Sequence, residues 1–170
     1  MKRVDNRIEL YRLFDNSMKT GVEIGVGDGT NAVNILECFP SMQLFLVDPW
    51  AGNPRRSKRY YRAVEGEARA KLEPYRDRAI VVRGKSAEFA SLIADKAFDF
   101  VYIDGDHSYD AVGLDLVLWH RRVKDGGILA GHDYVETKKH GVKRAVDDYV
   151  SYYNIKLGTF SGNWYWEVVW

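Results

Sequence analysis

The chain of 170 residues is long enough for one domain, residues 1–170, and its 46% hydrophobic and 29% charged residues are typical of a globular protein. A formal net charge of +1 gives no global attraction to nucleic acid or anionic membranes, and a single cysteine, Cys38, excludes both a disulfide framework and a cysteine-rich zinc site. No stretch has the length and apolarity of a membrane span or a secretory signal, so we expect a cytoplasmic protein without a membrane partner.

Short apolar, β-branched runs alternate with amphipathic stretches along most of the chain. Near-continuous apolar character is typical of central strands in a parallel sheet that is buried on both faces. The predicted strands are Val22–Val26, Gln43–Val47, Ala79–Arg83, Phe98–Ile103 and Gly127–Gly131. Between them we expect helices at about 31–39, 56–74, 86–94, 109–122 and 140–153. This alternation predicts an α/β fold with right-handed crossovers and helices on both faces of the sheet.

The end of the chain departs from this alternation. Ile155–Phe160 and Trp164–Val169 are two β-rich runs joined only by Ser161-Gly162-Asn163. So short a connection cannot cross over a sheet, and the two runs should form an antiparallel hairpin. We therefore expect a seven-stranded sheet in which only the last strand is antiparallel and lies beside the strand at 127–131. The tryptophans at 119, 164, 166 and 170 are expected in the core and in sheet packing, whereas an exposed one in the hairpin would mark a homo-oligomer contact.

A glycine-rich turn follows the first predicted strand in the segment EIGVGDGT, residues 23–30. Glycine permits positive φ angles and lets a ligand approach the backbone, and the helix that starts near Thr30 presents free N–H groups. The glycines stand at relative positions 1, 3 and 5, whereas the dinucleotide fingerprint has its third glycine at position 6. This spacing disfavours pyrophosphate binding, and a tight turn without any ligand is the alternative.

An acidic residue, Asp48, ends the second predicted strand. At the carboxyl end of that strand, about twenty residues past a glycine turn, a carboxylate can accept hydrogen bonds from both ribose hydroxyls of a nucleoside. The alternative is a helix N-cap, which Asp also suits and which the following Pro49 permits. The glycine turn and Asp48 together favour a cofactor that contains a nucleoside.

Two segments rich in acids and histidines follow the fourth and fifth predicted strands. They are Asp104-Gly105-Asp106-His107 and His132-Asp133. Because the carboxyl ends of adjacent parallel strands meet at one sheet edge, we expect these side chains to converge where open α/β sheets bind ligands. Converging carboxylates repel unless a proton or a cation bridges them, and oxygen ligands with an imidazole suit Mg²⁺ or Mn²⁺. The alternative is that Asp106, His107 and His132 only cap loops beside a cofactor.

Five segments, in chain order, resemble the class I S-adenosylmethionine-dependent methyltransferases: VEIGVGDGT, LVDPW, GKSAEFA, FDFVYIDGDHSYDAV and GGILAGHDY. Within that superfamily, DGDHSY and GHDY resemble a bacterial branch related to metal-dependent sugar and catechol-type O-methyltransferases. The resemblance runs from about residue 20 to residue 150. It implies a Rossmann-like methyltransferase fold and methyl transfer from S-adenosylmethionine to an oxygen of a small sugar-like or polyhydroxylated acceptor.

The resemblance also implies roles for single residues in cofactor binding. Asp48 would hold the ribose diol, Trp50 would lie close to the adenine, and Ser86 would contact the adenine, with a helix N-cap as its alternative role. Asp104 would contact both the cofactor and a metal. The other cofactor contacts that the resemblance implies, along the methionine, ribose and adenine, are Glu23, Gly25, Gly27 and Lys85.

Asp104 and Asp133 match residues that bind a divalent metal, Mg²⁺ or Mn²⁺, in the resembling O-methyltransferases. Such a metal fixes the acceptor hydroxyl and lowers its pKa. The sequence departs from its relatives here, because the catechol-type branch has Asn at the position of Tyr134 and the sugar-modifying branch has an acid at the position of His132. His132 is therefore the expected third ligand, with His107 as the alternative ligand, or His107 serves as a general base in place of metal activation.

Two other functions compete with methyl transfer. A metal-dependent hydrolase would use the same acids and histidines but would leave the glycine turn and Asp48 without a purpose. A non-catalytic or degenerate S-adenosylmethionine-binding module is favoured by the short segment before the first strand, where relatives carry helices over the acceptor pocket. Basic residues from Arg55 to Arg62 stand beside aromatic ones, yet acids in the same segment, residues 53–78, balance them. We therefore expect a small-molecule acceptor and not a nucleic acid.

Overall fold

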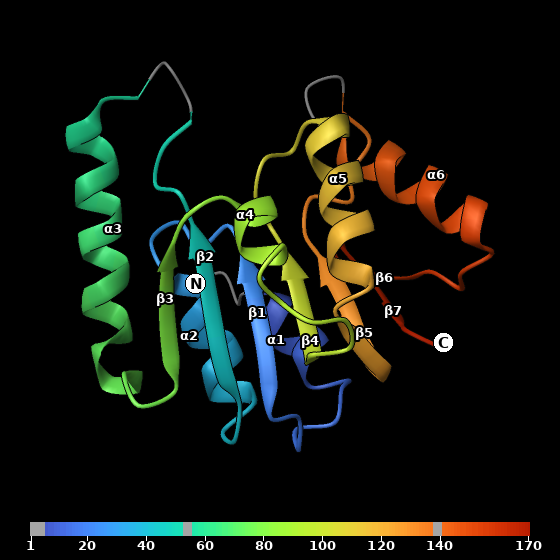
Figure 1. Ribbon diagram of the computed structural model, residues 1–170, viewed down its shortest axis with the longest axis horizontal. Coiled ribbons are helices and arrows are strands. Elements are labelled where there is room, and N and C mark those ends of the chain that lie inside the picture. The colour runs from blue at the N-terminus through green and yellow to red at the C-terminus, as the bar shows by residue number, and fades with distance from the viewer. Residues whose placement is uncertain (1–5, 53–55, 138–140) are drawn as a thin grey trace.

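The computed structural model describes residues 6–52, 56–137 and 141–170 and folds them around one seven-stranded sheet (Figure 1). The strands are β1 (Thr20–Ile24), β2 (Gln43–Asp48), β3 (Ala79–Arg83), β4 (Phe98–Ile103), β5 (Val123–Gly131), β6 (Gly158–Phe160) and β7 (Asn163–Glu167). They lie in the order β3-β2-β1-β4-β5-β7-β6. β1 to β5 are parallel, and β7 is antiparallel to both of its neighbours, which confirms the predicted mostly parallel sheet with a C-terminal antiparallel hairpin.

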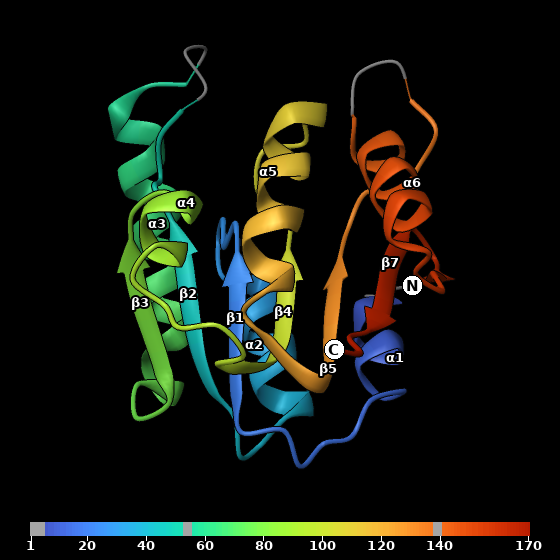
Figure 2. The ribbon, with the colours of Figure 1, turned by 45° about the vertical axis from the view of Figure 1, so that its right-hand side comes forward.

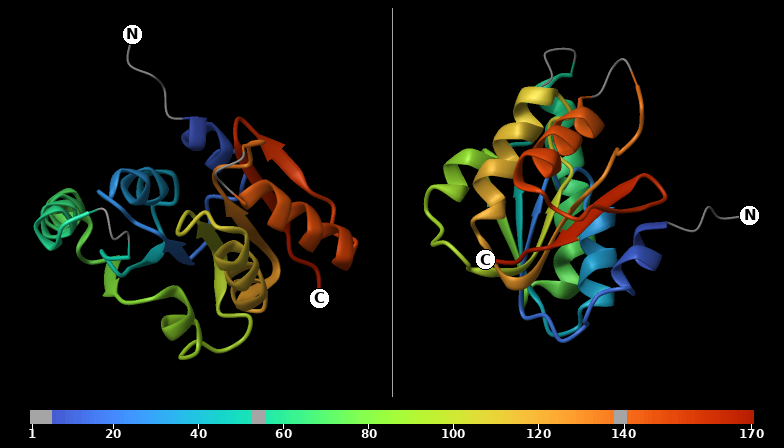
Figure 3. Two further views of the ribbon diagram at one scale, coloured as in Figure 1. Left: turned by 90° about the horizontal axis from the view of Figure 1, so that it is seen from above. Right: turned by 90° about the vertical axis from the view of Figure 1, so that its right-hand side faces the viewer.

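The helices form one layer on each face of the sheet, as the view from above in Figure 3 shows. One layer contains α1 (Asn6–Tyr11), α2 (Thr30–Cys38) and α3 (Lys58–Leu72), which continues into the 3-10 turn η1 (Glu73–Tyr75). The other layer contains α4 (Ser86–Ala90), α5 (Tyr109–His120) and α6 (Val142–Tyr153), and Figure 2 shows α5 and α6 beside each other in front of the sheet. These two layers confirm the predicted α/β class.

Side chains alternate between the two helical layers along the central strands. In β1, Val22 and Ile24 pack in the cluster that contains α5 and α6, whereas Glu23 points to the other layer and accepts a hydrogen bond from Asn31 of α2. Trp119 of α5 is completely buried in the same cluster as Val22, as predicted for the core. A sheet that is covered on both faces explains why its strands read as almost continuous apolar runs.

Several element boundaries differ from the prediction, and two of these shifts, at β5 and α4, are of about four residues. β5 begins at Val123 and not at Gly127, because Val123 pairs with Phe98 of β4 before the register of this pair shifts. α4 ends at Ala90 and not near residue 94, because Leu92 donates to a carbonyl three residues back and so tightens the chain into a turn. Both differences arise from backbone hydrogen bonds, which the spacing of apolar residues in the sequence does not reveal.

The C-terminal hairpin turns at Ser161 and Gly162, whose φ angles are 49° and 81°. Trp164 and Trp166 of β7 are 0% and 2% exposed, so they pack in the core and offer no surface for a second copy of the chain. Trp170, which follows the last strand, is 51% exposed. Within the described ranges, every helix is too short or too polar to cross a membrane.

Candidate cofactor and acceptor site

A cavity of about 1130 Å³ opens at the carboxyl ends of the parallel strands. Its walls come from the glycine turn after β1, the end of β2, the start of α4, the β4–α5 loop and the inner face of α5. Arg7 of the N-terminal helix α1 also lines the cavity. The cavity therefore lies where doubly wound α/β sheets bind their ligands.

The glycine turn brings the backbone close to both the β4–α5 loop and the cavity. Gly25 has a φ of +86°, and a Cβ atom on it would lie 2.1 Å from the carbonyl oxygen of Asp104, so no other residue fits there. Gly27 has a φ of +55°, and a Cβ atom on it would meet no heavy atom within 4 Å, because this part of the turn borders the cavity. The two glycines thus serve different purposes, close packing at Gly25 and an open wall at Gly27.

Asp48 holds the glycine turn in place. Its Oδ2 accepts hydrogen bonds from the backbone N–H groups of Val26 at 2.9 Å and Gly27 at 3.0 Å, and its Oδ1 accepts one from Trp50 N–H at 2.6 Å. Asp48 also lines the cavity, so the second lone pair of Oδ1 remains for a ligand. The carboxylate can hold the turn and a ribose hydroxyl at the same time.

Trp50 occupies a different position from the expected one beside the adenine. Its side chain is only 2% exposed and packs in the core under the cavity wall, and it does not line the cavity. Its indole N–H donates to the carbonyl oxygen of Gly27 at 2.9 Å. Trp50 has a φ of 41°, which turns the ring inward directly after β2. This tryptophan therefore supports the glycine turn from behind instead of stacking on a ligand.

Glu23 is a fully buried acid that lines the cavity. Its Oε1 accepts a hydrogen bond from Asn31 at 2.8 Å, while its Oε2 has no partner among the described residues. Burial raises the pKa of Glu23 to about 8. Asn31 is itself held by the hydroxyl of Tyr11 at 2.8 Å, so the carboxyl group is fixed in orientation. An unpaired buried carboxyl oxygen at a cavity is suited to a ligand that brings a donor, such as an ammonium group.

Lys85 and Ser86 lie at the start of α4 and both line the cavity, but Lys85 and not Ser86 is the N-cap residue. The Ser86 hydroxyl instead donates to Oδ1 of Asp115 at 2.5 Å and accepts a hydrogen bond from the indole of Trp119 at 2.7 Å. Asp115 is only 6% exposed, and burial raises its pKa to about 6. The sequence analysis missed Asp115, although an acid on the apolar face of a helix, directly before Leu116, is a signal for a functional role.

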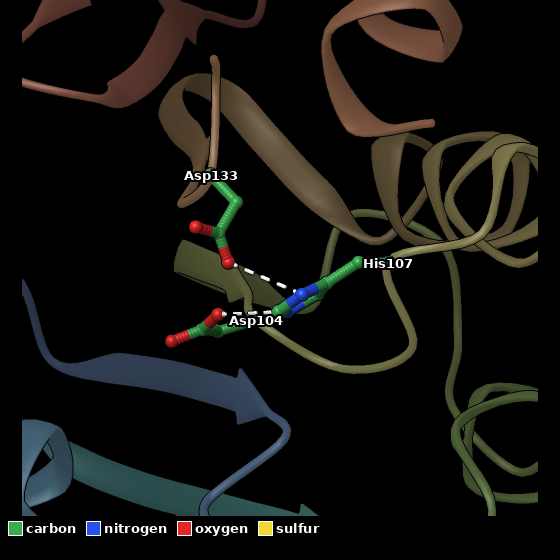
Figure 4. Close-up of side chains that lie close together, drawn as sticks. All are labelled: Asp104, His107 and Asp133. Atoms are coloured by element: carbon green, nitrogen blue, oxygen red, sulfur yellow. Dashed lines mark ion pairs between the residues drawn. The ribbon is translucent and has the colours of Figure 1, made fainter. Parts of the chain in front are cut away.

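Asp104, His107 and Asp133 converge, as Figure 4 shows, and the first two of them line the cavity. His107 Nε2 lies 3.4 Å from Oδ1 of Asp104, and its Nδ1 lies 3.2 Å from Oδ2 of Asp133. The hydrogen bond with Asp104 is the main cause that raises the pKa of His107 above its usual value. One ligand atom from each residue lies within 4.8 Å of the others, which is the spacing a metal site requires. The predicted convergence of the two segments is therefore present.

The third member of this cluster is His107, the alternative ligand of the sequence analysis, and not His132, which was expected first. The imidazole of His132 lies outside the cluster, with its Nδ1 3.5 Å from the other oxygen of Asp133. Asp106 accepts a hydrogen bond from the N–H of Ser108 at 2.8 Å and so has the loop-capping role that was its alternative. Tyr134 also points away, since its hydroxyl donates to Asp147 of α6 at 2.5 Å.

Arg7 is a second residue that the sequence analysis missed. It lies on α1, a helix of six residues that is too short to show an apolar period. Leu10 and Tyr11 of this helix are buried, and they hold it against the sheet. The Arg7 side chain then reaches Asp104, with Nη1 3.3 Å from Oδ2. No signal in the sequence links the two residues, because only tertiary packing brings them together.

A protein-family model described as a methyltransferase domain matches residues 22–134, more than half of the chain. The chain belongs to this methyltransferase family. The match spans the glycine turn, Asp48 and the Asp104–Asp133 cluster, and it confirms the S-adenosylmethionine-dependent methyltransferase that the resemblance implies. Curated protein sequences give no match.

Solved structures share the fold of this methyltransferase. NovP, an O-methyltransferase, is 19% identical, with 97% of this chain and 80% of NovP covered and a TM-score of 0.73. An O-methyltransferase from Bacillus cereus in complex with SAH is 14% identical, with 99% and 83% covered and a TM-score of 0.72. A candidate rRNA methylase from Clostridium thermocellum is 13% identical, with 96% and 94% covered and a TM-score of 0.72. At these identities the likeness supports the fold, and the acceptor has to be inferred from the site.

In this methyltransferase, the C-terminal hairpin positions the loop that carries Asp133. The N–H of Tyr134 donates to the carbonyl of Gly162 at 2.9 Å, and the indole of Trp164 donates to the carbonyl of His132 at 3.2 Å. Asp133 has a φ of 56°, a left-handed conformation that costs energy for a non-glycine residue. The hairpin contacts hold this conformation, which turns the carboxylate toward His107.

Proposed function

We propose that this methyltransferase transfers the methyl group of S-adenosylmethionine to an oxygen of a small, sugar-like or polyhydroxylated acceptor, assisted by Mg²⁺ or Mn²⁺. The observation that carries the proposal is the cluster of Asp104, His107 and Asp133, two of whose members, Asp104 and His107, line the same cavity as Glu23 and Asp48. A cofactor held at Glu23 and Asp48 would therefore share one cavity with the cluster.

The donor set of the cluster fits a divalent cation. Two carboxylates from the ends of adjacent strands face one imidazole, and carboxylate oxygens with an imidazole suit Mn²⁺ well and Mg²⁺ through the carboxylates. Asp104, His107 and Asp133 would hold the ion. When bound, such an ion orients an acceptor hydroxyl and lowers its pKa.

The chain's own residues position the two reactants. Oε2 of Glu23 is placed to accept a hydrogen bond from the ammonium group of the methionine part, and Asp48 is placed to accept one from the ribose. The acceptor oxygen attacks the sulfonium methyl carbon while the C–S bond breaks, and the hydroxyl proton leaves. In-line displacement needs mainly positioning and deprotonation of the acceptor, and a cavity that both reactants share would supply the positioning.

The geometry favours metal assistance over His107 as the only base. Both ring nitrogens of His107 face carboxylates, at 3.4 Å and 3.2 Å, so neither is directed at an incoming hydroxyl. A general base must lie within hydrogen-bond reach of the proton that it removes. His107 would have to leave one of its carboxylate partners before it could act alone.

Charge balance supports a small acceptor over a nucleic acid, because the formal net charge is only +1 and acids follow the basic residues within residues 53–78. Further along, Glu65 pairs with Arg69 at 2.9 Å and with Arg83 at 3.0 Å, and Lys71 pairs with Asp28 at 2.6 Å. These three bases lie outside the run from Arg55 to Arg62. Arg55, named in the sequence analysis, lies outside the described residues.

Two measurements test the proposal. Titration calorimetry with S-adenosylhomocysteine tests the cofactor, and production of S-adenosylhomocysteine from a panel of sugars and catechols tests the transfer. We expect EDTA to abolish turnover and Mg²⁺ or Mn²⁺ to restore it. Asp133→Asn should lower turnover on the order of 100-fold while cofactor affinity changes little, and Asp147→Asn on α6 is the control.

Other outcomes would point to the competing functions. A protein that binds S-adenosylhomocysteine but methylates no acceptor with any metal would be a binding module. Hydrolysis of a test substrate without cofactor binding would indicate a hydrolase. Turnover that survives EDTA but not His107→Ala would show a metal-free general-base mechanism.

A further inference from the structure

The basic residues along α3 fall into two groups that differ in their partners. Toward the end of the helix and after the turn η1, the bases pair with carboxylates in Arg69–Glu65 at 2.9 Å, Lys71–Asp28 at 2.6 Å and Arg76–Glu73 at 3.0 Å. At the start of the helix, four exposed bases form no ion pair with any carboxylate that the structure describes: Arg56, Lys58, Arg59 and Arg62. We call these four residues the α3 basic group.

The position of the α3 basic group is electrostatically unfavourable in the protein alone. The first turn of α3 contains no acid. The N-terminus of a helix carries a partial positive charge, so anions stabilise it and bases do not. Lys58 and Arg62 are four residues apart, so their like charges lie on one face of the helix and repel each other. An anion bound at the α3 basic group would relieve both repulsions.

The α3 basic group lies beside the cavity. α3 begins at the edge of the sheet toward which the parallel strands point, as Figure 1 shows. Tyr61 lines the cavity, and Lys58 precedes it by three residues, so the two are neighbours on the helix surface. The guanidinium carbon of Arg56 lies 4.6 Å from the ring centre of Tyr60, and the rings of Tyr60 and Tyr61 lie 5.5 Å apart. A molecule in the cavity can therefore extend past Tyr61 to these bases.

The chemistry of the α3 basic group suits phosphate. Guanidinium groups bind phosphate oxygens through paired hydrogen bonds, and a lysine adds a compact positive charge. A phosphate monoester carries about 1.5 to 2 negative charges at pH 7, whereas a carboxylate carries one. Several clustered cations therefore match a phosphate better than a carboxylate. The acids that follow from Glu65 onward confine the basic surface to the start of the helix.

We propose that the acceptor carries a phosphate group, which the α3 basic group binds beside Tyr61. This inference rests on the proposed methyl transfer to a small polyhydroxylated acceptor, and it narrows that class to phosphorylated sugars. A sugar phosphate and a sugar linked to a nucleoside diphosphate share this chemistry. The phosphate would hold one part of the acceptor while a hydroxyl reaches Asp104 and His107, which line the same cavity.

The first measurement is the binding of inorganic diphosphate to the protein saturated with S-adenosylhomocysteine, by calorimetry with EDTA present to remove metal ions. We expect binding by the wild-type protein, and a loss of affinity of about fivefold or more in Lys58→Ala and in Arg62→Ala, because each variant loses a charge-assisted contact. Lys58→Arg should retain the affinity. Arg76→Ala, which removes an exposed base paired with Glu73, is the control and should bind diphosphate as the wild-type protein does.

The second measurement distinguishes the two sources of phosphate. Glucose 6-phosphate and UDP-glucose are each tested for displacement of diphosphate, with glucose as the uncharged control. Stronger displacement by glucose 6-phosphate indicates a sugar phosphate, and stronger displacement by UDP-glucose indicates a nucleotide-linked sugar. Glucose should displace no diphosphate.

Three outcomes would overturn the inference. A protein that binds S-adenosylhomocysteine but no diphosphate, or unchanged affinity in both alanine variants, would remove the phosphate site and leave methyl transfer intact. A single-stranded RNA of about ten nucleotides that binds about 100-fold more tightly than diphosphate at about 0.15 M salt, and loses this affinity in the same variants, would identify a nucleic-acid surface instead. A protein that does not bind S-adenosylhomocysteine would overturn the proposed function together with this inference.

Discussion

Nη1 of Arg7 lies 3.3 Å from Oδ2 of Asp104, although 97 positions separate the two residues in the sequence. Oδ1 of the same carboxylate lies 3.4 Å from Nε2 of His107. Asp104 is thus placed between a guanidinium group from the first helix and an imidazole from its own loop. The short helix α1 therefore forms part of the cavity wall beside this cluster and does more than cover the sheet.

We expect Arg7→Ala to raise the KM for the acceptor and to lower kcat by about tenfold, because the charge-assisted contact that orients Asp104 is lost. The affinity for S-adenosylhomocysteine should change by less than about threefold, since Glu23 and Asp48 are untouched. Steady-state kinetics and calorimetry measure the two effects. Arg12→Ala, just after the same helix, is the control. An Arg7→Ala variant with wild-type kinetics would show that the ion pair serves only to attach α1.

Glu23 should make the stability of the ligand-free protein depend on pH. Its pKa in the folded protein is about 8, above the ordinary 4.5, so the folded state favours the neutral acid. The folded state should therefore lose stability as pH rises from about 4.5 to about 8. Glu23→Gln should remove this loss and stabilise the ligand-free protein at about pH 8.5 by a few kcal/mol, with little effect at about pH 4.5.

Urea unfolding of Glu23→Gln and wild-type protein at the two pH values measures this effect, and Glu67→Gln on the exposed face of α3 is the control. At about pH 8.5, where Glu23 is mostly ionised, the same Gln substitution should weaken binding of S-adenosylhomocysteine by about tenfold, because the charged partner of its ammonium group is lost. Equal unfolding free energies of both proteins at about pH 8.5 would contradict the raised pKa.

Asp48→Ala should weaken binding of S-adenosylhomocysteine by about 1.5–3 kcal/mol. Two causes combine, the lost bond to the ribose and the release of the Val26 and Gly27 N–H groups that the carboxylate now holds. Calorimetry also tests NAD, for which the wild-type protein should show no measurable affinity. Asp110→Ala is the control. Tight NAD binding, or unchanged affinity in Asp48→Ala, would be incompatible with the cofactor assignment.

Removal of residues 155–170 should cause aggregation. The deletion takes away β7, which covers the edge of β5 from Ile128 to Gly131, and an uncovered apolar strand pairs readily with other chains. It also removes Trp164 and Gly162, which hold the loop of His132 and Tyr134. Size-exclusion chromatography and light scattering measure the outcome. A soluble, folded monomer after this deletion would show that the hairpin is not needed to complete the sheet.

Much of this fold follows from local signals in the sequence. β3 and β4 have the predicted bounds, because each is an apolar run with polar or turn residues at both ends. The convergence of Asp104 and Asp133 also follows, since both residues end adjacent parallel strands. These predictions succeed because strand alternation and the position of strand ends are properties of short segments.

The remaining features depend on tertiary contacts. His107 and not His132 completes the cluster because Asp133 takes a left-handed conformation that the distant hairpin holds. Trp50 turns into the core because the Gly27 carbonyl offers it an acceptor. Asp115 carries no motif, and its place in the cavity wall emerges only when α5 packs beside Ser86. At these positions, contacts between segments that are far apart in the sequence determine where the side chain points. The local sequence pattern therefore gives no signal of it.

The position of β7 between β5 and β6 sets an order in which the two ends of the cavity can form during synthesis. The ribosome completes β1 to β4, and with them the Asp48 and Asp115 side, long before residues 163–167 emerge. Until then the edge of β5 has no partner on one side, and the His132–Tyr134 loop lacks the contacts from Trp164 and Gly162. The residues around Asp48 are thus synthesised before the residues that hold the His132–Tyr134 loop, so this loop is the last part of the site that can take its final conformation.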